Sequence, residues 1–416
     1  MSETENPTRR LLERFALIAF GLYHIPLFLN NYPSLGGGGF SEGLAVQWGH
    51  VFTPPGMWVA HVLFHMNGPM PLATGGDNGD VGEEFGRLII AVMIGVIGAA
   101  AWTLADRKRP GAKWVEGGLR TMLRYSIALG LASYALAKIL PQQFPPLTWS
   151  ALEVRVGELS PMRLLWNFMQ YSQPYAFFGG VMEMAVVVLL CFRRTATLGA
   201  LTCIAVMSNV AFLNLAYGVQ VKLYSLMMVA SAAVLVLYDT PRLMAMFAVN
   251  RPVAPATDAP FITDRLAAPV RWAIKIVLVG SVLVSSYITM APAMAAQRAT
   301  PGPVDGAWLV NSFVLNGKSL DSSANRARWR RLMVDANGVT VRLESDSLVR
   351  CRRNTSADPA SLKFACSKGR LGDFTWTRTG DHLQLDGVFD STKVSASALR
   401  VDYPLLTSKF RWIFDR

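Results

Sequence analysis

Residues 174–192 read PYAFFGGVMEMAVVVLLCF, an apolar run interrupted by a single charged residue, Glu183. A helix needs about 20 predominantly apolar residues, each adding about 1.5 Å, to cross the hydrocarbon core of a bilayer. This run meets that length, and a carboxylate inside it indicates a helix that packs among other helices, because charge facing lipid is costly. The stretch therefore predicts a polytopic α-helical membrane protein.

Six further runs of similar length give about seven transmembrane helices in all. The predicted spans are residues 12–30, 86–105, 122–141, 174–192, 195–216, 221–238 and 271–291. Two more stretches, 44–66 and 148–171, are apolar but contain His, Pro, Glu or Arg, and we interpret them as interfacial or re-entrant helices. Counting 44–66 as a span would give eight spans instead of seven.

The composition divides the chain into two unlike parts. Of 416 residues, 52% are hydrophobic and only 16% are charged, with a net charge of +12. Residues 301–416 contain 30 of the charged side chains, whereas the first 300 residues contain 38. So little polarity excludes intrinsic disorder, and four Cys exclude a disulfide-rich secreted scaffold.

The distribution of Lys and Arg predicts the orientation of the spans. The loop 31–85 contains neither residue, the loop that follows residue 105 is strongly basic, and Arg193-Arg194 marks a tight turn. Cytoplasmic loops carry an excess of Lys and Arg. Seven spans then place the N-terminus in the cytoplasm and residues 301–416 outside, whereas eight would put the tail in the cytoplasm, against the charge pattern. The basic excess is therefore an orientation signal for the lipid bilayer, and we exclude nucleic acid as a partner.

The tail, residues 301–416, predicts an antiparallel β domain, a small barrel or a meander. Alternating runs are separated by pairs of residues that favour turns. The runs are Trp308–Leu315, Gly338–Leu343, Phe374–Arg378, His382–Leu385 and Lys393–Leu399. The turn pairs are Asn316-Gly317, Asn337-Gly338, Gly380-Asp381 and Asp386-Gly387.

Three further features of the chain carry expectations. Cys351 and Cys366 would form a disulfide in an oxidising compartment, whereas the other two Cys lie inside spans as small hydrophobes. The arginines between 326 and 353 are expected on the solvated faces of strands, with lipid headgroups as the alternative ligand. Ala293-Met294-Ala295 has the composition of a signal-peptide cleavage site, although we expect the start of a linker there.

Ionisable and amide groups inside spans are the best pointers to a functional site. They are Lys138, Glu183, Asn209, Asn214, Lys222 and His24. The predicted topology places all six in the outer half of the membrane. The structural interpretation is a Lys138–Glu183 bridge that fixes helix packing, and the functional interpretation is a polar pocket for a quinone headgroup, a lipid headgroup or a small polar substrate.

His61 and His65 form a second constellation. Their i, i+4 spacing would put both rings on one face of a helix, as in many metal sites, and the loop that follows is acidic. No HExxH motif is present and no Cys is near. We therefore favour amphipathic histidines at the membrane interface over metal ligands.

The stretch YALAKILP at residues 134–141, the stretch GGVME at 179–183 and the turn Arg193-Arg194-Thr195 resemble the DoxX family of bacterial membrane proteins. That resemblance implies a four-helix core in a bacterial plasma membrane, with Lys138 and Glu183 at the positions of the family's motif. Some members are subunits of a thiosulfate–quinone oxidoreductase, and others associate with redox partners in the envelope.

These features together predict four regions. Residues 1–115 form an N-terminal membrane region with two spans, 116–240 the DoxX-like core, 241–300 a linker and seventh span, and 301–416 the exported β domain. One expected function is a subunit or partner of an envelope redox system, with a quinone or small molecule in the outward pocket and a membrane oxidoreductase as partner. The alternative is a transporter, or a scaffold that presents the β domain to lipids or proteins.

Overall fold

A computed structural model describes residues 7–31, 40–65, 80, 82–106, 113–254, 266–298, 302–320, 325–354 and 361–407. The chain forms two compact units. The helical unit consists of Met1–Phe144 and Ser172–Ala291, and the β unit consists of Pro145–Tyr171 and Pro292–Arg416. The segment 145–171, which we expected inside the DoxX-like core, thus belongs with the tail.

The helical unit contains eight long helices or helix segments in the described residues. They are α1 (Pro7–Asn31), α2 (Phe40–Phe64), α3 (Gly82–Ala105), α4 (Lys113–Ile139), α7 (Gln173–Cys191), α8 (Ala196–Ala216), α9 (Lys222–Leu237) and α11 (Ala268–Arg298), whose last residues enter the β unit. A 3-10 turn, η2 (Arg193–Thr195), joins α7 to α8. The short α10 (Thr240–Leu243) and the π-helical turn η3 (Met244–Ala248) follow α9.

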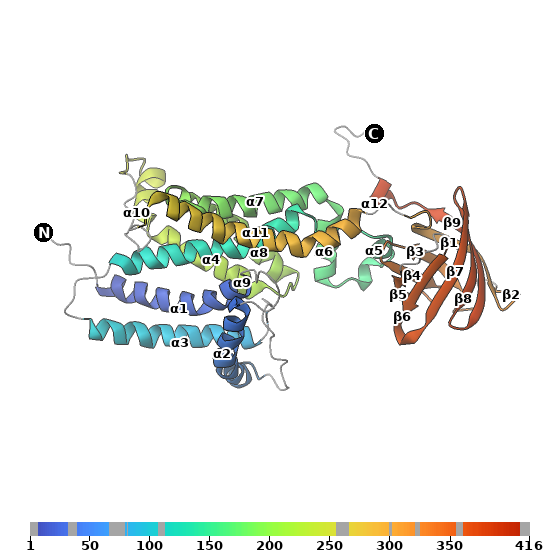
Figure 1. The fold of residues 1–416 in the computed structure, drawn as a ribbon, viewed down its shortest axis with the longest axis horizontal. Helices are drawn as coiled ribbons and strands as arrows, with labels where there is room; N and C mark the ends of the chain where they lie inside the picture. The colour runs from blue at the N-terminus through green and yellow to red at the C-terminus, as the bar shows by residue number, and fades with distance from the viewer. Residues whose placement is uncertain are drawn as a thin grey trace. The chain divides into compact units, whose positions relative to one another are not determined.

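Apolar faces of α4, α7, α8 and α9 form the core of this unit. Leu123, Ile127 and Leu131 recur at intervals of four residues along α4 and are fully buried. They meet Leu190 of α7 and Met228 of α9 in one cluster. Helix α1 packs against α3 and α4, and α2 crosses close to the end of α3 (Figure 1).

Four helices in the described part of the chain are long and apolar enough to cross a membrane. They are Glu84–Ala105, Gln173–Cys191, Arg193–Ala216 and Ala268–Ala295. A fifth would be the pair Lys222–Leu237 and Thr240–Ala248, which bends by 71°. The predicted spans in α1 and α4 are helical: the charged residues of α1 lie in its first two turns, whereas those of α4 are spread along the helix.

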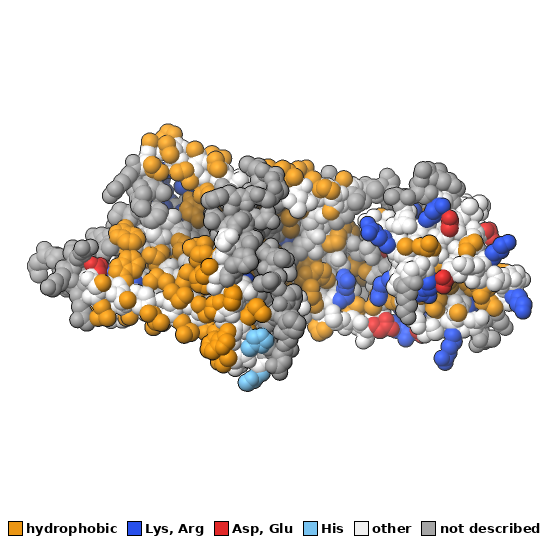
Figure 2. Space-filling model, turned by 60° about the horizontal axis from the view of Figure 1, so that its bottom comes forward, with side chains coloured by type: hydrophobic (Ala, Val, Ile, Leu, Met, Phe, Trp, Pro, Cys, Tyr) orange, Lys and Arg blue, Asp and Glu red, His pale blue; other side chains and the backbone are white. Residues whose placement is uncertain are grey.

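The surfaces of the two units differ in kind. Large apolar side chains are exposed along α3 and α11, including Met93, Ile97, Ile276 and Val277. Hydrophobic surface covers much of the helical unit, whereas Lys, Arg, Asp and Glu gather on the β unit (Figure 2). An apolar surface of this extent is typical of a membrane-embedded unit and not of a soluble protein.

The β unit contains an antiparallel barrel of eight strands, which narrows the expected barrel or meander to a barrel. The strands are β1 (Gly306–Leu315), β3 (Trp329–Val334), β4 (Gly338–Leu343), β5 (Leu348–Asn354), β6 (Ser361–Cys366), β7 (Leu371–Thr379), β8 (His382–Phe389) and β9 (Thr392–Val401). Each pairs with the next, and β1 also pairs with β9, which closes the sheet. A two-residue strand, β2 (Lys318–Ser319), forms a hairpin with β1.

Side chains fill the barrel interior. Trp308, Trp329, Phe364 and Phe374 are buried in one cluster, and the rings of Phe364 and Phe374 stack with centroids 5.7 Å apart. The inward side chains alternate with outward ones along β6, β8 and β9, as a half-buried strand requires. The described interior is therefore a packed core.

One predicted turn is wrong, and the strand around it shows why. Asp386-Gly387 lies inside β8, where a side chain on Gly387 would collide with the backbone of Asp373 and Phe374. This glycine permits close approach between strands and does not reverse the chain. The reversal comes at Asp390 and Ser391, which both have positive φ.

Candidate functional site

Lys138 and Glu183 form a direct ion pair inside the helical unit. Lys138 lies in the last turn of α4, and its Nζ donates hydrogen bonds of 2.8 Å to both carboxylate oxygens of Glu183 on α7. Their side chains are only 9% and 3% exposed. The pair expected from sequence is thus brought together in a bidentate and nearly dry arrangement.

Close packing of α4 on α7 surrounds this pair. A Cβ on Gly180 would lie 2.9 Å from the carbonyl oxygen of Ala135 and 2.9 Å from the Cβ of Lys138. Real Cβ atoms do not approach neighbours so closely without a shift of the backbone, so Gly180 sets the distance between the helices. The geometry serves packing and leaves little room for a ligand between Gly180 and Lys138.

Two tyrosines lie next to the ion pair. The Nζ of Lys138 is 5.8 Å from the centroid of the Tyr134 ring, which in turn lies 5.7 Å from that of Tyr224 on α9. The hydroxyl of Tyr224 is buried and has no hydrogen-bond partner among the described residues. Gly130 makes space for it, since a Cβ there would lie 2.3 Å from this oxygen. An unpaired buried hydroxyl is costly and marks a polar position that a ligand or water could satisfy.

Two of the remaining predicted residues lie where α8 turns into α9. Asn214 is buried and donates to the Oγ of Ser225 at 3.1 Å, which ties the two helices together. Lys222 pairs with Asp80 at 3.0 Å, and Asp80 also accepts the backbone N–H groups of Lys222 and Leu223. Asp80 therefore stabilises the N-terminus of α9 both as a cap and as a negative charge.

The last two predicted residues lie elsewhere. His24 is buried on α1, and its Nε2 lies 2.8 Å from the Oγ of Ser231 on α9. Asn209 is exposed on α8. The six residues thus belong to separate interactions, and only Lys138 and Glu183 contact each other directly.

The predicted histidine pair does not share a helical face. Helix α2 ends at Phe64, and His65 leaves it with a φ of 51°, which breaks the i, i+4 relation to His61. Both rings are exposed. Among the described residues, no three His, Cys, Asp or Glu side chains lie close enough together to hold a metal ion.

The β unit holds a cluster that sequence reasoning missed, centred on Glu153. This carboxylate lies between α5 (Trp149–Leu152) and the 3-10 turn η1 (Val156–Glu158), and it is 8% exposed. It pairs with Arg331 of β3 at 3.0 Å and with Arg342 of β4 at 2.9 Å, and it accepts a hydrogen bond from the hydroxyl of Tyr403. Arg342 also donates to the backbone carbonyl of Glu153.

A second carboxylate fixes the same segment from the opposite direction. Asp335, in the β3–β4 turn, accepts the backbone N–H of Trp149 at 2.8 Å and both the N–H and the hydroxyl of Ser150. Burial raises the pKa of the Asp335 carboxyl, although these hydrogen bonds oppose the shift. We call the contacts of Glu153 and Asp335 the clamp, because they bind residues 149–153 to strands β3 and β4.

The structure corrects the expectation for the arginines of the tail. Arg331 does not lie on a purely solvated strand face, because it pairs with Glu153, and Arg328 is buried and pairs with Glu344 at 2.6 Å. The stretch 148–171 is α5, η1 and the amphipathic α6 (Pro161–Tyr171), all within the β unit. The sequence signal for the clamp is a carboxylate, Glu153, between the apolar residues Leu152 and Val154.

A disulfide joins Cys351 of β5 to Cys366 of β6, which face each other in the strand register. Cys191 and Cys203 are free and buried in the helical unit.

Comparisons with known proteins assign neither a family nor an activity to this chain. No family model matches the chain, and no solved structure matches it. An uncharacterized protein of Bacillus subtilis strain 168, YwoB, is 28% identical over 135 residues, which are 32% of this chain and 86% of the relative. The fold thus defines a class, a multi-helix protein with membrane-length apolar helices and a β-barrel unit. The chain is similar to YwoB over a third of its length, and that relative's name gives no activity.

Proposed function

We propose that the chain is a multi-pass membrane scaffold that presents its β barrel on the outer face of a bacterial plasma membrane. The clamp is the observation that supports this function most strongly. It binds the barrel to the connection between α4 and α7, so the barrel is joined to the helical unit through three chain crossings, after Phe144, before Ser172 and after Ala291. A barrel on one flexible linker would need no such contacts.

The clamp also supports the proposed topology. Residues 145–171 and 292–407 fold together, so they lie on the same side of the membrane and an even number of spans separates them. Helices α7, α8 and α11 supply three, and the bent pair of α9 and α10 then counts as the fourth. With α1, α3 and α4 as spans, this gives the seven expected from sequence.

Two features support the outer side for the β unit. The turn Arg193-Arg194 lies one span away from the β unit, and its charges favour the cytoplasm. The Cys351–Cys366 disulfide favours an oxidising compartment for the barrel. The N-terminus is then cytoplasmic.

The scaffold is tested by purifying the full chain from native membranes together with whatever binds the barrel. We expect a stoichiometric protein partner without quinone, retained by Glu158→Ala and lost with Glu153→Ala. Glu158 is a suitable control because its carboxylate is exposed in the same segment. A partner that persists after loss of the clamp would contradict the scaffold function.

A redox-associated role is the second candidate, and the unpaired hydroxyl of Tyr224 beside Lys138 and Glu183 favours it. In that role the polar group would bind a quinone and Glu183 would pass protons, as the DoxX resemblance suggests. Membranes containing the protein should then show quinone-dependent turnover that Glu183→Gln abolishes. Retained turnover in this variant would exclude the role for the carboxylate.

A further inference from the structure

The segment Thr240–Ala248, which follows α9, presents large apolar side chains on the surface of the helical unit. It consists of α10 and η3, and its axis turns by 71° from that of α9. Met244, Met246 and Val249 are exposed, and Phe247 is the most open of the group at 74%. Side chains of this kind need an apolar environment, which the helical unit itself does not supply.

The base of this segment is fixed by Asp239, which is buried. Its carboxylate accepts a hydrogen bond from the hydroxyl of Thr197 on α8 and pairs with Arg242 at 3.1 Å and with Arg120 of α4 at 3.8 Å. Its backbone carbonyl accepts the N–H of Leu243 at 2.9 Å. The fold therefore holds the exposed side chains in place and sets the direction in which the segment leaves α9.

The exposed apolar side chains do not form a single stripe. Met244 and Met246 are two positions apart, as are Phe247 and Val249, so within each pair the side chains point to nearly opposite sides of the helix. A groove on a protein would cover one face of such a segment. Lipid chains surround it, so this distribution favours a bilayer as the environment.

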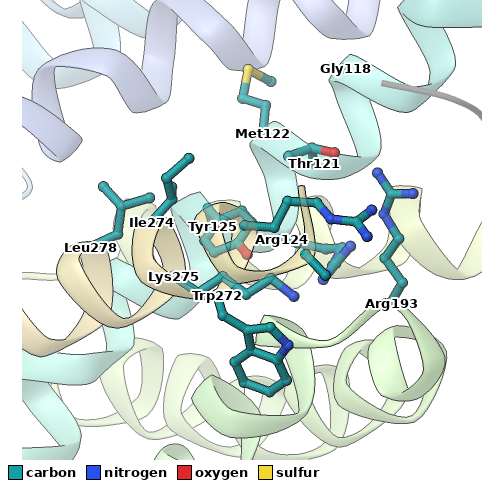
Figure 3. A pocket seen from close by; sticks show the side chains of 12 residues that line it. Gly118, Thr121, Met122, Arg124, Tyr125, Arg193, Trp272, Ile274, Lys275 and Leu278 are labelled. Atoms are coloured by element: carbon teal, nitrogen blue, oxygen red, sulfur yellow. The ribbon is translucent and has the colours of Figure 1, made fainter. Parts of the chain in front are cut away.

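Aromatic side chains mark the membrane boundary at this end of the helical unit (Figure 1). Trp102 near the end of α3 and Trp114 at the start of α4 have ring centroids 5.8 Å apart. Tyr238 directly precedes Asp239 and α10. Trp272, in the first turns of α11, lies 5.4 Å from the Phe192 ring and lines a cavity of about 420 Å³ (Figure 3). The segment thus leaves α9 close to the level of this boundary.

The length of α9 gives the depth at which the segment lies. Its 16 residues extend about 24 Å, whereas the hydrocarbon core of a bilayer is about 30 Å thick. The ion pair of Lys222 with Asp80 belongs at the outer boundary, so the other end of α9 stops about 6 Å short of the cytoplasmic boundary. A bend of 71° then carries the chain nearly parallel to the membrane plane, at the depth typical of in-plane helices.

We propose that Thr240–Ala248 is an in-plane anchor whose apolar side chains lie among the acyl chains of the cytoplasmic leaflet. Arg242 and Arg251 flank the apolar residues, and no Asp or Glu occurs in residues 240–254. A basic and apolar segment suits the surface of an anionic leaflet, and the exposed Arg251 can extend to the headgroups. The choice of leaflet rests on the proposed topology, whereas the contact with lipid does not.

The test measures the depth of a nitroxide attached to Phe247→Cys. The full chain is reconstituted in vesicles of phosphatidylglycerol and phosphatidylethanolamine, and the signal of the native chain corrects for labelling of the buried Cys191 and Cys203. Electron paramagnetic resonance then compares collisions with oxygen, which enters the bilayer, and with a water-soluble nickel chelate. We expect oxygen to collide with the Phe247→Cys label more often than the chelate does.

Two further labels serve as matched controls. Ile276→Cys, exposed on α11, should also favour oxygen, and Arg194→Cys, exposed in η2 at the same end, should favour the chelate. A Phe247→Cys label that favours the chelate while Ile276→Cys favours oxygen would overturn the anchor and leave the membrane protein intact. Low collision with both reagents would also overturn it, because it would show a protein surface, such as a second copy, over the segment.

The outcome does not depend on which way the chain is inserted, since an inverted topology changes the leaflet and not the depth of the label. If Phe247→Cys does not fold, Met246→Cys decides by the same comparison, because Met246 is exposed in the same turn. A label on Ile276→Cys that favours the chelate would contradict the membrane-embedded scaffold itself, and the anchor with it.

Discussion

The two units each bury a carboxylate, and they satisfy it in different ways. Glu183 in the helical unit has one partner, Lys138, which approaches both of its oxygens. Glu153 in the β unit accepts hydrogen bonds from two arginines and a tyrosine that lie 178, 189 and 250 residues away in sequence. The Lys138–Glu183 pair joins two neighbouring helices, whereas the Glu153 cluster joins a connection between helices to strands that lie far along the sequence. Burial alone therefore does not tell whether a charge fixes local packing or connects separate parts of a chain.

The sharpest way to test this contrast is Glu153→Ala. It leaves Arg342, which is 1% exposed, and Arg331 without their carboxylate and Tyr403 without its acceptor. Removing one partner from a buried ionic cluster costs about 3–5 kcal/mol, and we expect the upper end here because three groups lose their partner. Hydrogen exchange of the β3 and β4 amides measures the loss, and Glu158→Ala should change it by less than about 0.5 kcal/mol.

Lys138→Met should lower the free energy of unfolding by somewhat less, about 3–4 kcal/mol, and should loosen the packing of α4 on α7. The remaining carboxyl can take up a proton, which limits the cost of leaving it buried. The double variant Lys138→Met, Glu183→Leu should recover most of the loss, because apolar residues of similar size can replace a buried pair. A denaturation series on the full chain in detergent gives the double-mutant cycle. Failure of the double variant to recover stability would argue for a functional role of the pair.

The disulfide offers a comparison inside the β unit. Replacing Cys351 and Cys366 by Ser opens a loop with a sequence separation of 15 residues, which should destabilise the barrel by about 3 kcal/mol. The helical unit should be unaffected. Hydrogen exchange, followed separately for the amides of each unit, measures the loss of stability in the barrel and in the helices. An equal effect on the helical unit would mean that the units unfold together.

The smallest expected effect is a pH dependence of the clamp. Burial, followed by the hydrogen bond to Glu153, raises the pKa of Tyr403 to about 12 from an ordinary value of 10.0. Because this pKa is raised in the folded state, the contribution of Tyr403 to the stability of the β unit is complete below pH 10 and is lost as the pH rises towards 12. The stability of the β unit should therefore fall less over this range in Tyr403→Phe than in the native chain. Parallel pH profiles for the two proteins would show that Tyr403 contributes nothing to the clamp.

The parts of the candidate site that the sequence predicts are those in which a charged residue interrupts an apolar run. Glu183 and Lys138 each interrupt a long apolar run, so their pairing could be inferred from sequence alone. The closed barrel could be predicted only in part, because β3 and β5 are rich in arginine and do not stand out from the sequence as apolar strands. The clamp could not be predicted, because its arginines resemble the many surface cations of the tail until the fold brings Glu153 to them. Gly387 shows the same limit, since a close contact between strands and a turn both require glycine.

The clamp holds the barrel to the connection between α4 and α7, and cutting the other connection tests this directly. A protease site inserted between Arg298 and Gly302 allows the chain to be cut from outside in spheroplasts, which leaves only non-covalent contacts between the barrel and residues 145–171. We expect the cut barrel to stay with the membrane in the native chain and in Glu158→Ala, and Glu153→Ala to release it into solution. Release of the barrel from the native chain upon cleavage would contradict the claim.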